Sequence, residues 1–220
     1  MSDDATTIAG YRAALTMVPL PDRAIAIYTV ADLETYVDRG ALLRGDAEPP
    51  YWAHLWTGAR VLAAYVERWV PVAGKTVLDL GCGLGLTGLV AARGGGRVQF
   101  VDSAGAALEF VAASARANGV AVHARAADFR ELPPDERFDV ILAAEVAYDP
   151  PTFSDLAAAL ARHLAPAGTA LVADGYRTDT RPLYRALGGR ALLPQSIDVR
   201  ASEDGRVAPV RITSLRLRGS

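Results

Sequence analysis

Short apolar segments alternate with longer amphipathic segments along the chain from Lys75 onward. Runs rich in Val, Leu, Ile and Ala predict strands at residues 76–80, 97–102, 121–126, 138–143 and 168–174. Apolar residues at helical spacing predict helices near residues 85–93, 104–118 and 152–164. Regular alternation of strand and helix is typical of a parallel sheet with helices on both faces. We therefore predict an α/β protein with a doubly wound, mostly parallel sheet.

The pattern changes after Gly175. A short helix is predicted near residues 181–187, followed by two strands near 192–199 and 208–217. The segment between these two strands is too short for a crossover helix. They are therefore expected to form a C-terminal hairpin that contains one antiparallel strand. With the five earlier strands, the predicted sheet has seven.

The first 50 residues lack this alternation. A β-like run spans Ala24–Val30, a short helix is predicted at 31–37, and the polar, proline-tipped stretch 44–50 indicates a loop. We interpret residues 1–50 as an extension that packs on the core and residues 51–220 as the main part of a single domain. The main part opens with an amphipathic helix, whose apolar stripe comprises Val61, Leu62, Tyr65, Val66 and Trp69.

Composition narrows the class of protein. Hydrophobic residues make up 51% of the chain and charged residues 22%, which is enough for a sizeable core. The formal net charge of −2 offers no broad basic surface to nucleic acid. No apolar run approaches the roughly 20 residues of a membrane span, and the acidic start Met1–Asp4 lacks a signal-peptide pattern. We expect a cytoplasmic protein without a membrane or nucleic-acid partner.

A glycine-rich turn follows the first core strand. Residues 77–85 contain an acid, Asp79, and then three alternating glycines, Gly81, Gly83 and Gly85. The next strand ends in a second acid, Asp102. A turn without Cβ atoms lets a ligand approach the backbone closely, and an acid at the end of the next strand suits two ribose hydroxyls. The pattern predicts a cofactor that carries a nucleoside.

The position of Asp79 distinguishes between two such cofactors. Gly83, Gly85 and Gly88 formally satisfy the dinucleotide pattern G-x-G-x-x-G, but the first glycine after the strand is Gly81, so the register is poor. A carboxylate at Asp79 would repel the pyrophosphate of a dinucleotide. S-adenosylmethionine has no phosphate and carries a sulfonium and an ammonium group, which a nearby carboxylate favours. The run 77–85 resembles motif I of the class I, seven-strand methyltransferases.

Polar and aromatic residues also follow the third and fourth strands, where open α/β sheets bind ligands. Asp128 is placed to accept a hydrogen bond from an adenine amine, and Phe129 is placed to stack on the ring; a loop acid beside a buried Phe is the alternative. Glu145 ends an otherwise apolar strand, and a buried carboxylate needs a cation. That cation is the cofactor, the substrate or a loop arginine. Tyr148 lies beside it or packs in the core.

The segment from Glu145 to Tyr148 resembles the (D/E)-x-x-(Y/F) motif of protein-lysine methyltransferases within the seven-strand group. Residues 49–58 resemble the aromatic stretch that precedes motif I in that branch. The chain is most similar there to the enzymes that methylate the β-subunit of electron-transfer flavoprotein, over roughly residues 18–190. Two departures are Glu145, where relatives often carry Asp, and Thr57, where they often carry Pro or Ala.

The resemblance implies a Rossmann-like methyltransferase fold and a role for each matching residue. Glu145 and Tyr148 would sit at the substrate lysine, and Ala144 would bind the cofactor through its backbone. Cofactor binding is expected from Trp56, Asp79, Gly81, Gly83, Gly85, Asp102, Asp128, Phe129 and Ala144. No metal site is predicted, because His54, His123 and His163 lack metal-ligand spacing.

The leading hypothesis is methyl transfer from S-adenosylmethionine to a protein lysine ε-amine, with S-adenosylhomocysteine as product. The β-subunit of electron-transfer flavoprotein is the candidate partner that the resemblance implies. A small-molecule N-methyltransferase on the same fold is the main alternative. A non-catalytic nucleoside-binding module and a nicotinamide reductase are weaker ones. The segment after the fourth strand is not Asn-Pro-Pro-Tyr, which argues against amide or adenine nitrogens as acceptors.

Overall fold

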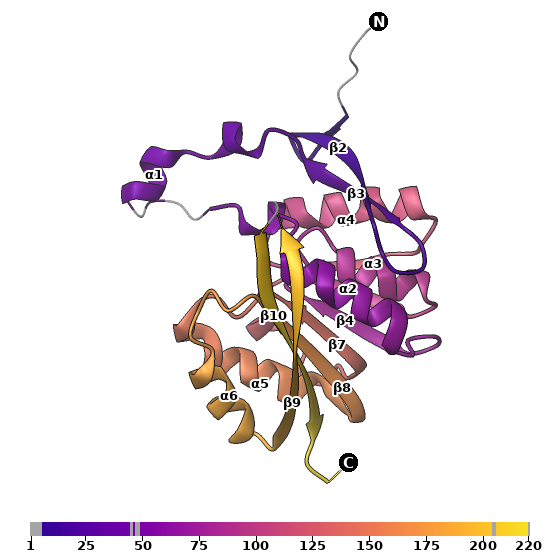
Figure 1. Ribbon diagram of the computed structural model, residues 1–220, viewed down its shortest axis with the longest axis vertical. Coiled ribbons are helices and arrows are strands. Elements are labelled where there is room, and N and C mark those ends of the chain that lie inside the picture. The colour runs from indigo at the N-terminus through magenta and orange to yellow at the C-terminus, as the bar shows by residue number, and fades with distance from the viewer. Residues whose placement is uncertain (1–5, 45, 47–48, 204–205, 220) are drawn as a thin grey trace, which may run out of the picture.

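The computed structural model describes residues 6–44, 46, 49–203 and 206–219 (Figure 1). The acidic start at Met1–Asp4 lies outside these residues. The main sheet has seven strands in the order β6-β5-β4-β7-β8-β10-β9. They are β4 (Thr76–Leu80), β5 (Arg97–Asp102), β6 (His123–Ala126), β7 (Phe138–Ala144), β8 (Leu164–Asp174), β9 (Leu192–Glu203) and β10 (Arg206–Leu217).

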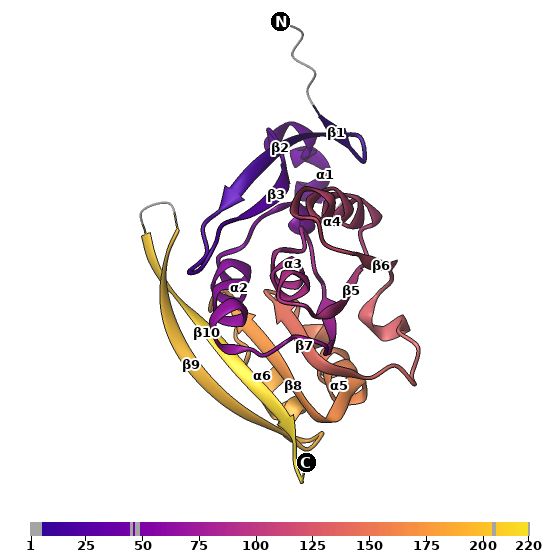
Figure 2. The ribbon, with the colours of Figure 1, turned by 90° about the vertical axis from the view of Figure 1, so that its right-hand side faces the viewer.

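Strand directions agree with the predicted fold. The strands from β6 to β8 pair in parallel, and β10 pairs antiparallel with both β8 and β9. The two last strands form the hairpin that bends along one side of the molecule (Figure 2). The prediction of a doubly wound, seven-stranded, mostly parallel sheet with a C-terminal antiparallel hairpin is confirmed.

Helices cover both faces of this sheet (Figure 2). One face carries α2 (Thr57–Trp69), α3 (Leu86–Arg93) and α4 (Gly105–Asn118), and the other carries α5 (Phe153–His163) and α6 (Arg181–Gly188). Side chains alternate between the two faces along each strand. Val77 therefore belongs to the core under α2–α4, while its neighbour Leu78 belongs to the core under α5 and α6. Burial on both faces explains why these strands are almost wholly apolar.

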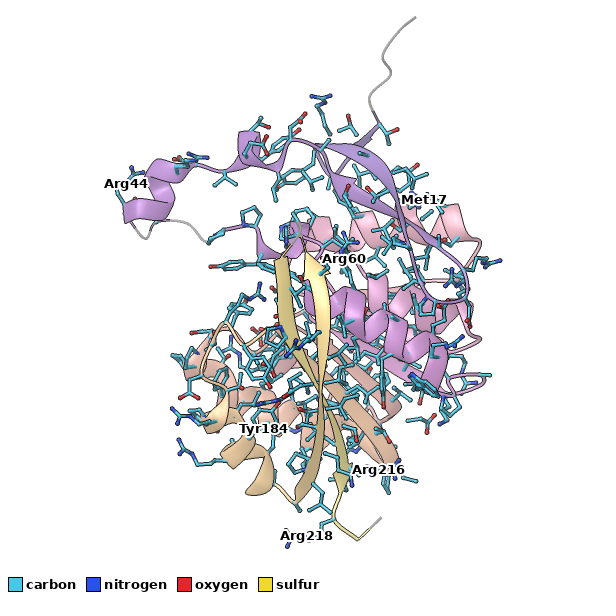
Figure 3. All side chains as sticks on the ribbon, in the orientation of Figure 1. Met17, Arg44, Arg60, Tyr184, Arg216 and Arg218 are labelled. Carbon is cyan, nitrogen blue, oxygen red and sulfur yellow. The ribbon has the colours of Figure 1, made fainter. Side chains whose placement is uncertain are left out.

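A second, three-stranded antiparallel sheet lies against α4 (Figure 1). It consists of β1 (Thr7–Ile8), β2 (Tyr11–Val18) and β3 (Ile25–Val30), and only β3 is predicted from the sequence. β3 is tied to α4 because the Asn118 side chain accepts from the Ala26 amide at 3.1 Å and donates to its carbonyl at 2.6 Å. β2 escaped prediction because it is exposed: Met17, on β2, is 60% exposed (Figure 3).

The remaining short elements connect this sheet to the main one. They are the 3₁₀ turns η1 (Leu33–Tyr36), η2 (Tyr51–Ala53), η3 (Phe129–Glu131) and η4 (Pro150–Thr152), and the helix α1 (Arg39–Arg44). The stripe predicted for α2 is wrong at one position, because Trp69 is the last residue of the helix and is 70% exposed. Within the described ranges, no helix has the length and apolar character needed to cross a bilayer.

Candidate active site

A cavity of about 620 Å³ lies at the carboxyl ends of β4, β5, β6 and β7. This is the edge at which open α/β sheets bind ligands. The residues predicted for a site lie far apart in the sequence, and the sheet brings them together here. All eleven line this cavity: Trp56, Asp79, Gly81, Gly83, Gly85, Asp102, Asp128, Phe129, Ala144, Glu145 and Tyr148.

The glycine-rich turn after β4 forms the floor of the cavity. Gly81 has φ +63° and Gly83 has φ +51°, a region that side chains with a Cβ rarely adopt. A Cβ on Gly81 would lie 2.6 Å from Cγ1 of Val146, and one on Gly83 would lie 3.0 Å from the carbonyl oxygen of Trp52. Both positions therefore need glycine for space as well as for backbone conformation.

Asp79 is buried beneath this turn. One of its carboxylate oxygens accepts a hydrogen bond of 2.8 Å from the backbone N–H of Gly88, in the first turn of α3. Burial raises the pKa of Asp79 to about 7, and the nearby charge of Asp102 adds to the effect. A group with this pKa is only partly charged at neutral pH. A cation bound beside it would favour the charged form.

Asp102 holds the glycine-rich turn in shape. Its carboxylate accepts hydrogen bonds from the backbone N–H of Gly83 at 2.8 Å and of Ala104 at 2.9 Å. Burial raises the pKa of Asp102 above its usual value. A carboxylate has about four acceptor positions, so these backbone donors leave acceptor capacity for a ligand hydroxyl.

Asp128 is engaged locally. Its carboxylate caps η3 and forms a paired contact with the Arg130 guanidinium, at 2.8 and 2.7 Å. These hydrogen bonds lower the pKa of Asp128. An amine donor from a ligand would share the carboxylate with Arg130. Phe129, the next residue, lines the same end of the cavity.

Glu145 follows β7 with its backbone in the left-handed region, at φ +58°. This conformation is uncommon for a residue with a side chain, and it costs on the order of 1–3 kcal/mol. The backbone N–H of Glu145 donates to the carbonyl of Ala173 on β8 at 2.8 Å. The side chain is only 5% exposed. Positive-φ strain of this kind is typical of functional positions.

Three donors surround the Glu145 carboxylate. The backbone N–H of Gly58 lies 3.0 Å from Oε1, and that of Gly175 lies 3.3 Å from Oε2. The third donor is the Arg177 guanidinium, 2.5 Å from Oε2. Burial raises the pKa of Glu145 despite this cation. Of the three cations expected from the sequence, the structure contains the loop arginine.

Aromatic side chains stand beside Glu145. We call Tyr51, His54, Trp56 and Tyr148 the aromatic wall; all four line the cavity. Ring centroids of Tyr51 and Tyr148 are 5.3 Å apart, and those of His54 and Trp56 are 4.4 Å apart. Tyr148 is 51% exposed. The alternative that Tyr148 packs in the core is therefore wrong.

Trp52, from the same segment, contacts aromatic rings outside the aromatic wall. Its ring lies 5.3 Å from that of Tyr11 on β2 and 5.6 Å from that of Phe110 on α4. It also lines the cavity. Cys82, between two of the glycines, has its thiol pKa raised by burial, which agrees with a packing role. Among the described residues, no cluster of His, Cys, Asp and Glu suits a metal ion.

Sequence reasoning missed four residues of the site: Tyr51, Gly58, Gly175 and Arg177. Gly175 and Arg177 follow the strand predicted at 168–174, so the rule applied to the other strand ends would have included them. Gly58 carries no such signal, because its backbone N–H acts on a residue 87 positions away.

Comparison with known proteins adds to this geometry. Residues 77–168 match the methyltransferase domain family. The matched stretch contains Asp79, the glycine-rich turn that follows it, Asp102, and Glu145 with Tyr148. The prediction of S-adenosylmethionine as the cofactor agrees with this match.

Two curated relatives illustrate the breadth of acceptors. The cypemycin N-terminal methyltransferase of Streptomyces sp is 35% identical over 50% of this chain and 46% of its own. The protein N-lysine methyltransferase METTL21A of Danio rerio is 34% identical over 54% of this chain and 58% of its own. The chain thus spans about half the length of these relatives.

A solved structure shows the same fold over nearly the whole chain. It is the Burkholderia thailandensis 1,6-didemethyltoxoflavin-N1-methyltransferase, with bound 1,6-didemethyltoxoflavin and S-adenosylhomocysteine. The TM-score is 0.63 at 20% sequence identity, and the likeness covers 94% of this chain and 96% of the other. At this identity the likeness establishes the fold alone. The specific resemblance to electron-transfer flavoprotein methyltransferases stays a prediction.

Proposed function

We propose that this protein transfers a methyl group from S-adenosylmethionine to an amine of a protein, with a lysine ε-amine as the preferred acceptor. The observation that carries the proposal is Glu145, a buried carboxylate that binds a cation at the edge of the cavity within the matched domain. A carboxylate in this position provides a binding site for a protonated amine. Neutral acceptors, such as hydroxyls, would leave it without a cationic partner once Arg177 moved.

The residues around the cavity fit the proposed cofactor. The volume of about 620 Å³ is within the usual range for small-molecule sites. Asp102 retains acceptor positions for ribose hydroxyls, and Phe129 offers a ring for the adenine. Asp79, with a pKa of about 7, gains charge beside a cationic group. The cofactor, when bound, supplies an electrophilic methyl group for in-line displacement.

The chain's own residues would then act mainly by position and charge. Glu145 receives the acceptor as an ammonium ion and orients it after the proton has left to water. Burial leaves the Glu145 carboxylate less strongly solvated than a surface acid, and this loss of solvation raises its pKa. Trp56 and Ala144 flank the cofactor side of this position. Tyr148 narrows the approach from solvent.

The exposure of the aromatic wall supports a macromolecular acceptor. Tyr51 is 41% exposed and Tyr148 is 51% exposed, so the cavity is open to solvent on this side. A long side chain from another protein can enter such an opening, whereas a small metabolite would be enclosed only in part. The β-subunit of electron-transfer flavoprotein is the first protein to test. We further propose that residues 1–50 shape the acceptor side, since Tyr11 also lines the cavity.

The deciding experiment incubates the purified protein with tritiated S-adenosylmethionine and a host lysate, then separates macromolecules from small molecules. The expected result is a labelled protein, absent with Glu145→Ala and present with Glu109→Ala, which removes an exposed acid on α4. Mass spectrometry then identifies the modified residue. Label confined to small molecules would replace the proposal by the metabolite enzyme, and label on protein hydroxyls would reject the amine acceptor.

A further inference from the structure

Arg177 lies where the acceptor amine is proposed to bind. The loop after β8 carries it there: Gly175 donates to Glu145, and Tyr176 adopts φ +58°. The Arg177 guanidinium then contacts Glu145 on one side and the ring face of Trp56 on the other. Its Cζ atom is 3.9 Å from the centroid of the Trp56 ring.

Arg177 thus occupies both groups that favour a cation beside the cavity, the Glu145 carboxylate and the face of the Trp56 ring. A buried carboxylate attracts a cation through charge, and an aromatic face attracts it through the ring quadrupole. Among the described residues, the other hydrogen-bond donors to the carboxylate are the backbone N–H groups of Gly58 and Gly175. A second cation beside the guanidinium would have to share the Glu145 carboxylate with it, because the nearby Asp174 carboxylate already accepts from the Tyr176 N–H and the Tyr184 hydroxyl. Glu145 and Trp56 therefore accommodate one cation at a time.

We propose that Arg177 is a specificity-determining residue that holds the cation position at Glu145 in the absence of an acceptor, and that an acceptor amine binds by displacing it. The inference rests on the proposed function and concerns which amines are accepted as substrates. Arg177 is suited to leave, because its side chain is 44% exposed while that of Glu145 is 5% exposed. The guanidinium can move into water without moving the carboxylate.

The competition determines which acceptors are methylated. When only a fraction of the protein has the position open, the apparent dissociation constant rises by the inverse of that fraction. A free small amine has no other contacts with which to offset this loss. A lysine within a protein has contacts along the aromatic wall and beyond. Arg177 thereby selects against small amines and in favour of amines on macromolecules.

A binding measurement tests this without requiring methyl transfer. The probe is n-butylammonium, which has the end of a lysine side chain, titrated into protein whose Trp56 indole N–H signal is followed by NMR and assigned with Trp56→Phe. We expect Arg177→Ala to bind the probe about tenfold more tightly than the wild type, a difference of about 1.4 kcal/mol. Glu145→Gln, in the Arg177→Ala background, should lose this gain.

Two further variants separate charge from packing. Arg177→Met keeps a long side chain against Trp56 without a charge, and it should bind the probe as tightly as Arg177→Ala. Arg181→Ala removes an 84% exposed side chain that pairs with Asp179, and it should match the wild type. Equal dissociation constants for wild type and Arg177→Ala, or no binding by either, would overturn the inference.

A second measurement separates this inference from the proposed function. Methyl transfer to Nα-acetyl-lysine amide is followed at saturating S-adenosylmethionine. We expect Arg177→Ala to lower KM for this probe about tenfold and to leave kcat within about twofold. A merely structural role would lower kcat and leave KM unimproved. Absence of transfer to any amine, together with tighter n-butylammonium binding by Arg177→Ala, would reject the proposed function and retain the competition at Glu145.

Discussion

The Glu145 carboxylate and the Gly58 backbone N–H lie 3.0 Å apart, although 87 residues separate them in the chain. This contact joins the start of α2 to the residue that follows β7. It is possible because Gly58 has no side chain: a Cβ there would lie 2.4 Å from Oε1 of Glu145. The backbone at the start of α2 thus holds the side chain of Glu145, the acid proposed to bind the acceptor amine, in position.

Gly58→Ala should therefore displace Glu145 without unfolding the protein. The added methyl group must push the carboxylate away, while alanine favours helix over glycine by up to about 1 kcal/mol. We expect turnover to fall at least tenfold at unchanged or higher thermal stability. Gly105→Ala is the matched control, because it lies in the first turn of α4 with nothing within 4 Å of its Cβ. Wild-type turnover in Gly58→Ala would contradict the role of this contact.

Glu145→Gln should separate chemistry from cofactor binding. The amide keeps the shape of the side chain but removes the charge that is proposed to bind the acceptor ammonium. We expect turnover to fall by roughly 10²–10³, the range seen when a charged or oriented catalytic partner is removed, with the dissociation constant for S-adenosylmethionine within about threefold of wild type. Calorimetry and radiometric assay measure the two quantities. Parallel losses in both would indicate a structural role instead.

The raised pKa of Asp79 predicts that its contribution to the free energy of unfolding decreases as the pH rises. An acid whose pKa is lowered by folding shows the opposite dependence on pH. The folded protein retains a proton on Asp79 up to about pH 7, whereas the unfolded chain releases it near 3.8. The stability that this proton contributes is fully present below pH 3.8 and is lost as the pH rises to 7. The difference in unfolding free energy between wild type and Asp79→Asn should fall by up to about 4 kcal/mol over this window.

The comparison with Asp79→Asn is needed because other acids act in the opposite direction. Hydrogen bonds hold the pKa values of Asp139 and Asp179 below their usual range, so their contributions are lost as the pH falls. Urea titrations at a series of pH values provide the free energies. A difference that is constant between pH 4 and 7 would show that Asp79 is already charged in the folded protein.

Asp102→Asn should weaken cofactor binding. The asparagine keeps one acceptor oxygen, but its NH₂ group faces a backbone N–H of Gly83 or Ala104, so the glycine-rich turn loosens. We expect the dissociation constant for S-adenosylmethionine to rise at least tenfold, measured by calorimetry. Asp155→Asn, a half-exposed acid on α5, serves as the control. An unchanged dissociation constant would reject the assignment of Asp102 to the ribose.

Thr57 offers a route to a more stable protein. Within the described residues, its buried hydroxyl has no hydrogen-bond partner. Such a group costs roughly 1–3 kcal/mol, so Thr57→Val should raise the unfolding free energy by about 1 kcal/mol. Thr213→Val is the contrasting variant, since the Thr213 hydroxyl is bonded to Tyr184 and Ser196 and its loss should destabilise. Equal changes in the free energy of unfolding for the two substitutions, measured by urea denaturation, would contradict a destabilising role for the Thr57 hydroxyl.

Much of the fold was predictable because its signals are local. Short apolar strands such as Thr76–Leu80 are buried on both faces, and glycines mark where they end. β2 was not predictable, because Arg12 and Thr16 interrupt its apolar residues and Met17 is exposed, so the segment resembles a surface loop as much as a strand. Its position depends on pairing with β3 and on β3 packing against α4, which are long-range contacts.

The candidate site likewise contains residues that could be predicted from local sequence and residues that could not. Asp79 and Asp102 were predictable because each stands directly at a strand end beside a glycine-rich turn. The sequence also indicated that Glu145 needs a cation, but left its identity open. Arg177 could be identified as that cation only once the path of the loop after β8 was known. In this loop Tyr176 has a left-handed backbone conformation, which no pattern of residues predicts. Stacking on Trp56 is likewise a product of tertiary structure.

The family match stops at residue 168 and begins at residue 77. Gly58 and Trp56 come before it, and Gly175 and Arg177 come after it. The turn that would hold the cofactor therefore lies within the matched stretch, while the donors around Glu145 come from flanking segments. A substitution in either flanking segment can therefore alter the surroundings of Glu145 while the glycine-rich turn stays unchanged.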